Sequence, residues 1–183
     1  WADGGSETPR WCEVPQPFGG SRLGQGQLDG DALAFQDGHL LVHPDVNIGV
    51  VLAVEQGLIV PSISQAQSKS LLQISQIAKN LTARAKEGRL SPEEYGGATF
   101  SVSNLGMFGV DEFIAVIMPP NSAMLGIGTV IDQPVVRNGE IVTAKTMKAV
   151  LSVDHRVTDG VEAARYLAEF KRLLEQPLSL LLK

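Results

Sequence analysis

The sequence predicts an α/β fold, and three observations lead to this class. Residues 47–54 are almost wholly apolar and rich in β-branched side chains, which is typical of a strand covered on both faces. Apolar residues recur at helical spacing over residues 71–85 and again over 161–174. Further β-rich runs lie between these two predicted helices, so strands and helices alternate along the chain.

The first predicted helix has clear start and stop signals. A second strand over residues 57–61 precedes it, after a short turn. Ser70 and Gln73 have the spacing of a capping box, in which the serine and the glutamine satisfy backbone N–H groups at a helix start. Gly88 is expected to end the helix.

The second half of the chain is predicted to return to strands and to end in a helix. Residues 91–94 (Ser-Pro-Glu-Glu) indicate a short helix, with serine as cap and proline at the first helical position. Asn138-Gly139 predicts a tight hairpin, and Asp159 with Glu162 predicts the start of the final helix, which Pro177 ends. Strands are expected over residues 98–103, 123–130, 135–136 and 141–154.

The N-terminal part differs from the rest. Residues 1–34 are rich in glycine and proline without periodicity, so we expect a loop or linker-like segment. Asp37-Gly38 between two apolar runs predicts a short hairpin. The chain starts at Trp1 rather than Met, and we expect it to be a piece of a longer protein.

Composition excludes several classes. The 183 residues are 44% hydrophobic with a net charge of −5, which fits one folded domain and argues against a nucleic-acid partner. No apolar run approaches the ~18–20 residues that span a bilayer, so no membrane association is expected. The single cysteine, Cys12, excludes an internal disulfide and fits a reducing compartment.

Of the three histidines, His155 is the best candidate for chemistry. His39 and His43 lie four residues apart on a predicted strand, where they do not converge, so we interpret them as surface residues and expect no metal site. His155 lies where a β-rich run meets the last helix, a position that suits an acid/base residue. A purely structural role fits too, with Asp159 as the helix cap and Arg156 as its ion-pair partner.

A second candidate lies at the end of the strand over residues 98–103. Thr99, Ser101 and Ser103 alternate and share one face, and Ser103-Asn104 falls at the strand end, where a hydroxyl or amide could donate to an oxyanion. The alternative is an ordinary polar face on a half-exposed strand.

The segment Asp-His-Arg-Val-Thr-Asp-Gly at 154–160, with Ser-Asn-Leu-Gly at 103–106, resembles the catalytic domain of the dihydrolipoamide acyltransferases of 2-oxo acid dehydrogenase complexes. Further matching stretches run in order from about residue 35 to 182. They include residues 47–49, 57–61, 84–91, 97–100, 118–120, 125–128 and 175–177.

The resemblance implies a chloramphenicol-acetyltransferase-like fold, a two-layer α+β sandwich with a mixed sheet and helices on one face. Residues 35–183 would be the acyltransferase catalytic domain, incomplete on its N-terminal side. His155 would be the general base, Asp159 its structural partner, and Ser103 the oxyanion donor contributed by a neighbouring subunit; we also expect Asn104 to contact coenzyme A.

The resemblance further implies a homotrimer that assembles into a cubic or dodecahedral core, as part of a complex of the pyruvate dehydrogenase type. The chain would move an acyl group, most simply acetyl, between coenzyme A and a lipoyl group carried on a separate domain, without a metal. It would work in the bacterial cytoplasm or the mitochondrial matrix. Two alternatives are a non-catalytic structural core subunit and a same-fold acyltransferase acting on a small soluble acceptor.

Overall fold

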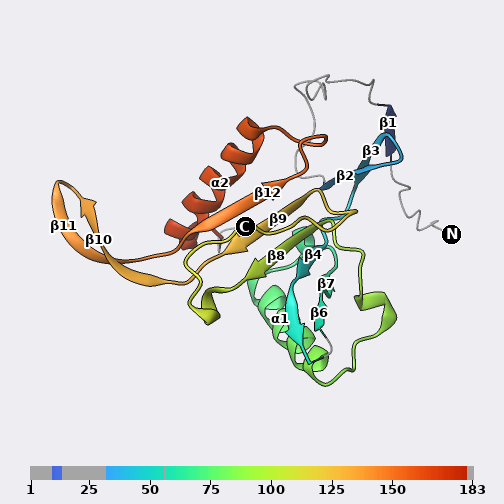
Figure 1. The fold of residues 1–183 in the computed structure, drawn as a ribbon, viewed down its shortest axis with the longest axis horizontal. Coiled ribbons are helices and arrows are strands. Elements are labelled where there is room, and N and C mark those ends of the chain that lie inside the picture. The colour runs from blue at the N-terminus through green and yellow to red at the C-terminus, as the bar shows by residue number, and fades with distance from the viewer. Residues whose placement is uncertain (1–9, 14–31, 56, 181–183) are drawn as a thin grey trace.

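A five-stranded mixed sheet forms the body of the molecule in the computed structural model, which describes residues 10–13, 32–55 and 57–180 (Figure 1). The strands in spatial order are β12 (Ala149–Val153), β9 (Ala123–Ile127), β8 (Phe100–Asn104), β4 (Ile48–Val50) and β7 (Ser62–Ile63). The central strand β8 runs parallel to β9 and β4, whereas the outer strands β12 and β7 run antiparallel to their neighbours. The predicted α/β class with a mixed sheet is therefore confirmed.

The alternating polar residues 99, 101 and 103, at the start of and along β8, face the interior. Thr99, Ser101 and Ser103 share one face as predicted, but all three are buried, and Ser101 is fully inaccessible. The interpretation as the polar face of a half-exposed strand is therefore wrong. Ser101 lies against Gly49 of β4, where an added Cβ would come within 2.6 Å of the serine Oγ.

The apolar run over residues 47–54 is divided between two sheets. After β4 the chain forms β5 (Leu52–Val54), which pairs with β6 (Gly57–Ile59) in a separate two-stranded sheet. Ala53 of β5 is exposed and Leu52 and Val54 are only half-buried, so this part of the predicted strand is not covered on both faces.

The two long helices begin at the predicted caps. α1 (Leu71–Lys86) starts with the Ser70–Gln73 capping box, buries Leu81 and Ala85, and contacts β5 and β7. α2 (Gly160–Glu175) starts with Asp159 as cap and contacts β12. Because α1 and α2 contact strands near opposite ends of the strand order, together they flank most of the sheet (Figure 1).

Two hairpins have the turns that the sequence predicts. β2 (Ala32–Gln36) and β3 (His39–His43) are joined by Asp37-Gly38, and β10 (Ile131–Arg137) and β11 (Glu140–Thr146) by Asn138-Gly139. All four turn residues have positive φ, as the favoured two-residue hairpin turn requires. Figure 1 shows β10 and β11 projecting away from the body of the molecule.

Short elements complete the described part of the chain. β1 (Arg10–Glu13) pairs with β3 and so forms a three-stranded sheet with the first hairpin. The remaining elements are short 3-10 helices: η1 (Ala66–Ser68), η2 (Pro92–Glu94), η3 (Gly106–Phe108) and η4 (Pro177–Leu180). The loop or linker expected over residues 1–34 stays a prediction, since 1–9 and 14–31 lie outside the described residues. Within the described part, no helix is both long enough and apolar enough to cross a membrane.

Candidate active site

His155 lies in a tight turn between β12 and α2. The main-chain oxygen of Asp154 accepts hydrogen bonds from the N–H groups of Val157 (2.9 Å) and Thr158 (3.1 Å). The N–H of Asp154 donates to the oxygen of Ser122, next to the start of β9 (2.7 Å), which ties the turn to the sheet. His155 lines a cavity of about 350 Å³, and Phe35 and Asn121 lie in its wall. The other lining residues are Ile117, Pro119, Pro120, Val153, Asp154 and Arg156.

Asp159 is the cap of α2, as predicted. Its Oδ1 accepts hydrogen bonds from the N–H groups of Val161 (2.8 Å) and Glu162 (2.9 Å). The hydrogen bond from the Glu162 N–H is the main reason why the pKa of Asp159 lies below its ordinary value, and the nearby charges of His155 and Arg165 add to the effect. Asp159 therefore fixes the start of the helix directly after the turn that carries His155.

Arg156 pairs with Asp154, so the expected ion pair between Arg156 and Asp159 is wrong. Arg156 Nη2 lies 2.6 Å from Asp154 Oδ2, and Nε lies 2.9 Å from Oδ1. These hydrogen bonds lower the pKa of Asp154 and raise the pKa of Arg156. The two residues on either side of His155 are thus bonded to each other.

Ser103 and Asn104 lie at the end of β8, beside a second cavity of about 640 Å³. Ser103 is 8% exposed. Asn104 is exposed, and its Oδ1 accepts a hydrogen bond from the Gly106 N–H (2.9 Å). The NH₂ group of the same side chain can therefore donate to a bound molecule. The cavity rim is apolar and exposed, and it includes Leu58, Met107, Phe108, Ile114, Val116 and Met118.

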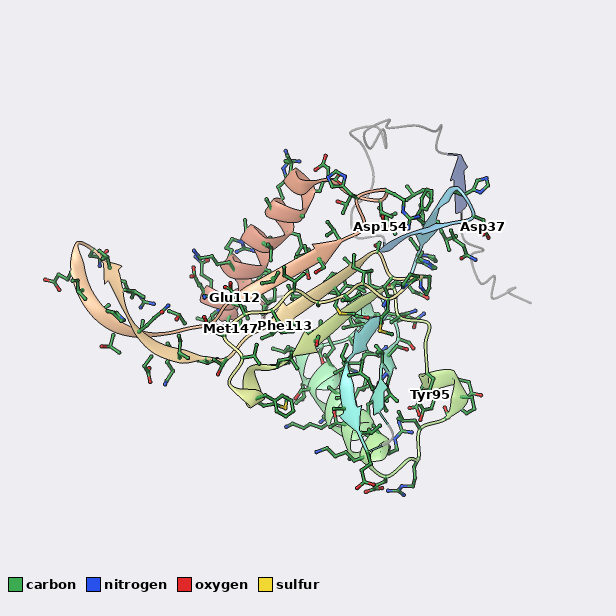
Figure 2. All side chains as sticks on the ribbon, in the orientation of Figure 1. Asp37, Tyr95, Glu112, Phe113, Met147 and Asp154 are labelled. Atoms are coloured by element: carbon green, nitrogen blue, oxygen red, sulfur yellow. The ribbon has the colours of Figure 1, made fainter. Side chains whose placement is uncertain are left out.

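Within one chain the two candidate groups are apart. Ser103 pairs with Gly126 of β9, three residues from Ala123, which pairs with Val153 of β12. At ~3.3 Å per residue this places Ser103 roughly 10 Å along the strands from Val153, and His155 follows two residues beyond. Figure 2 shows Asp154 and Met147 near opposite ends of β12, with Asp154 close to the first hairpin. His155 and Ser103 accordingly line different cavities.

Two residues near His155 gave no signal in the sequence. Phe35 of β2 lies under the Arg156 guanidinium, with 4.4 Å from Cζ to the ring centroid. Asn121 is buried, and its side-chain NH₂ donates to Ser101 Oγ (2.7 Å). Asn121 is brought to the site by the pairing of β9 with β12, and Phe35 by the contact between the first hairpin and the His155 turn, and short-range patterns reveal neither.

The other histidines lie on the first hairpin. His39 Nδ1 lies 2.8 Å from the oxygen of Asp37, and burial lowers the pKa of His43. Both are partly buried, so the interpretation of them as surface residues is only partly right. Over the described ranges, no three His, Cys, Asp or Glu side chains gather as a metal ion would need.

Comparison with known proteins decides the family. The family model for the 2-oxoacid dehydrogenases acyltransferase (catalytic domain) matches residues 31–182. The chain belongs to this family.

Curated relatives of this family member are bacterial acetyltransferase components. The dihydrolipoyllysine-residue acetyltransferase component of the pyruvate dehydrogenase complex of Rhizobium meliloti is 45% identical over 149 residues, which cover 81% of this chain and 33% of the relative. The corresponding component of the acetoin cleaving system of Bacillus subtilis is 40% identical over 148 residues, covering 81% of this chain and 37% of the relative. The chain thus spans about a third of the length of these relatives.

Solved structures confirm the fold class. A probable dihydrolipoamide acetyltransferase from Listeria monocytogenes matches with a TM-score of 0.76 and 29% identity, covering 79% of this chain and 62% of that chain. The cubic core of the pyruvate dehydrogenase multienzyme complex matches with a TM-score of 0.77 and 30% identity, covering 82% of this chain and 63% of that chain. The chain therefore has the chloramphenicol-acetyltransferase-like fold of these catalytic cores.

Proposed function

We propose that this chain is part of an acyltransferase core that moves an acetyl group between coenzyme A and dihydrolipoamide in a pyruvate dehydrogenase complex. The observation that carries the proposal is the spacing of the site residues. Ser103 and His155 are 52 positions apart, and Asp159 is four positions further on. The solved dihydrolipoamide acetyltransferase of Azotobacter vinelandii is 31% identical to this chain, with a TM-score of 0.77. A serine, a histidine and an asparagine have a role in its catalytic mechanism, and these three residues have the same spacing.

His155 is the general base in this proposal. A thiol with a pKa of ~8.5 is only a few per cent thiolate at neutral pH, so a base that removes its proton speeds attack on a thioester. An exposed turn at the end of a strand, held rigid by Asp154 and by the helix cap Asp159, suits such a base. His155 then returns the proton to the leaving thiol, and the same residue serves both directions.

Ser103 is the oxyanion donor. The attack forms a tetrahedral intermediate with a negative oxygen, and a preorganised hydroxyl lowers its energy by roughly 3 kcal/mol. Ser103 lies on the central strand of the sheet and lines the 640 Å³ cavity, so the strand fixes the position from which its hydroxyl can donate. Asn104, one residue on, would contact coenzyme A through its free side-chain NH₂.

The site is proposed to form between two copies of the chain, because one copy places His155 and Ser103 in different cavities. The apolar rim around Ser103 and the segment 113–120 offer a surface for the second copy. The β10–β11 hairpin projects from the body of the molecule (Figure 1), and because a two-stranded ribbon alone is marginally stable in water, it would offer a further contact to a second copy. These features support a homotrimer that assembles into a larger core, with a lipoyl domain as substrate, in the bacterial cytoplasm.

An acetyl-transfer assay tests the proposal. The protein is given acetyl-CoA and dihydrolipoamide, and His155→Ala and Ser103→Ala are compared with the unchanged protein. We expect His155→Ala to abolish turnover and Ser103→Ala to lower kcat by about 10²–10³-fold. Equal turnover by His155→Ala and the unchanged protein contradicts the proposal.

The two alternatives give different results in the same assay. A structural core subunit would neither transfer acetyl nor bind coenzyme A in calorimetry. An enzyme for a small soluble acceptor would use acetyl-CoA with that acceptor and show no activity on dihydrolipoamide.

A further inference from the structure

We propose that Asp154, Arg156 and Phe35 form a clamp that positions His155 for proton transfer. The inference rests on the proposed function, because it concerns how that base is held. These three are positioning residues: the contacts that define the clamp are with one another, and they act through the turn that carries the histidine.

The first half of the clamp joins the two neighbours of His155. Asp154 Oδ1 accepts hydrogen bonds from the main-chain N–H of Arg156 (3.0 Å) and from its Nε (2.9 Å). Asp154 Oδ2 accepts from Nη2 (2.6 Å). The Asp154 side chain is only 18% exposed, so the carboxylate is a fixed anchor, and it holds the main-chain N–H that follows His155.

The second half of the clamp comes from a distant part of the chain. The Phe35 ring on β2 lies 4.4 Å from Arg156 Cζ, at a distance where a guanidinium is attracted to an aromatic face. Phe35 pairs with Leu40 of β3, a buried residue, so the ring projects from an ordered hairpin. Arg156 is thus held by a carboxylate and by an aromatic face at once, and only a planar guanidinium can do so with two parallel hydrogen bonds and a flat stacking surface.

The exposure of Arg156 indicates that the clamp acts on geometry rather than on stability. The Arg156 side chain is 60% exposed, and an ion pair with such an exposed partner contributes little to the free energy of folding. A displacement of about 1 Å at a catalytic group, by contrast, lowers a rate by up to ~10²-fold. We therefore expect loss of the clamp to change turnover more than the melting temperature.

The test compares Arg156→Ala with Arg172→Ala as the matched control. Arg172 forms a similar exposed pair with Glu169 on α2, with Nε 2.7 Å from Oε2 and Nη2 2.6 Å from Oε1. We expect Arg156→Ala to lower kcat about 10–100-fold with KM changed less than about threefold, and Arg172→Ala to leave both near wild type. Arg156→Lys keeps the charge without the stacked fork, so it should recover part of the kcat, and Phe35→Leu should lower kcat less than Arg156→Ala.

Hydrogen–deuterium exchange of the turn gives a readout that does not depend on activity. The N–H groups of Arg156, Val157 and Thr158 are hydrogen-bonded. The exchange rate of the peptide that contains them should therefore rise several-fold in Arg156→Ala and stay at the wild-type value in Arg172→Ala. If wild type is active and Arg156→Ala has the same kcat, the clamp proposal is overturned. If wild type transfers no acetyl group, the proposed function fails; the exchange rates then decide the clamp alone, and an unchanged rate overturns it.

Discussion

Replacing Gly106 with alanine should destabilise the fold and disturb the Ser103 end of β8. A Cβ on Gly106 would lie 2.6 Å from the main-chain oxygen of Gly128 and 3.0 Å from Thr129 Cα. These are backbone atoms directly after β9, so they cannot move aside as a flexible side chain would. Gly106 also donates its N–H to Asn104 Oδ1, so any shift of Gly106 is passed to the residue next to Ser103.

The magnitude follows from the overlap. Forcing one extra methyl group into close-packed surroundings typically costs about 1–3 kcal/mol. For a chain of this size, each kcal/mol lowers the melting temperature by about 2–4 °C, so we expect a fall of about 2–12 °C. Gly106 is not among the glycines with positive φ, so the effect is steric and not one of backbone strain.

Gly160→Ala is the matched control. Nothing lies within 4 Å of a Cβ at Gly160, its φ is not positive, and it is the first residue of α2. Alanine should therefore leave the melting temperature unchanged or raise it slightly. Calorimetry and urea unfolding of both variants measure the effect. The steric reasoning is refuted if Gly106→Ala has the melting temperature of wild type, or if Gly160→Ala lowers the melting temperature as much as Gly106→Ala does.

Two further predictions concern carboxylates. The hydrogen bonds from Arg84 and the Ser91 N–H lower the pKa of Glu94 from 4.5 to about 2, so its stabilising effect is present above pH 4.5 and is lost as the pH falls towards 2. Thermal unfolding should show Glu94→Gln melting below wild type at pH 7, with the gap closing between pH 4.5 and 2; a gap that persists at pH 2 contradicts the assignment. Asparagine can accept the two hydrogen bonds that cap α2, so Asp159→Asn should keep acetyl transfer while Asp159→Ala loses part of it and melts lower at pH 7. Because the pKa of Asp159 is also lowered, the melting difference between Asp159→Ala and wild type should shrink as the pH falls below 3.8, and an inactive Asp159→Asn would show that the charge itself is needed.

Local signals in the sequence predicted local structure well. The caps Ser70 and Asp159 and the turns at 37–38 and 138–139 depend on hydrogen bonds and φ angles within a few residues, so each could be predicted without knowing the fold. The pairing of Arg156 with Asp154 instead of Asp159 was missed because both acids are close in sequence, and only the shape of the turn selects between them.

Features that depend on strand order could not be predicted from short patterns. Whether the face with Ser101 and Ser103 is buried depends on what packs against β8, and residues 47–54 divide because β5 finds a partner outside the main sheet. The positions of Phe35 and Asn121 beside His155 likewise depend on segments far apart in sequence. The motif around His155 indicated the candidate site residues, but the separation of His155 from Ser103 within one chain follows only from the register of β8, β9 and β12.

Mixing two variants that are each strongly impaired tests the central claim, that His155 of one copy works with Ser103 of another. His155→Ala and Ser103→Ala are co-expressed in equal amounts, so that mixed assemblies form, and acetyl transfer is measured against wild type. If each site takes its histidine from one copy and its serine from the next, about one quarter of the sites receive both intact residues, and activity should recover to about a quarter of wild type. Mixed assemblies with no more activity than the separate variants would contradict the shared site.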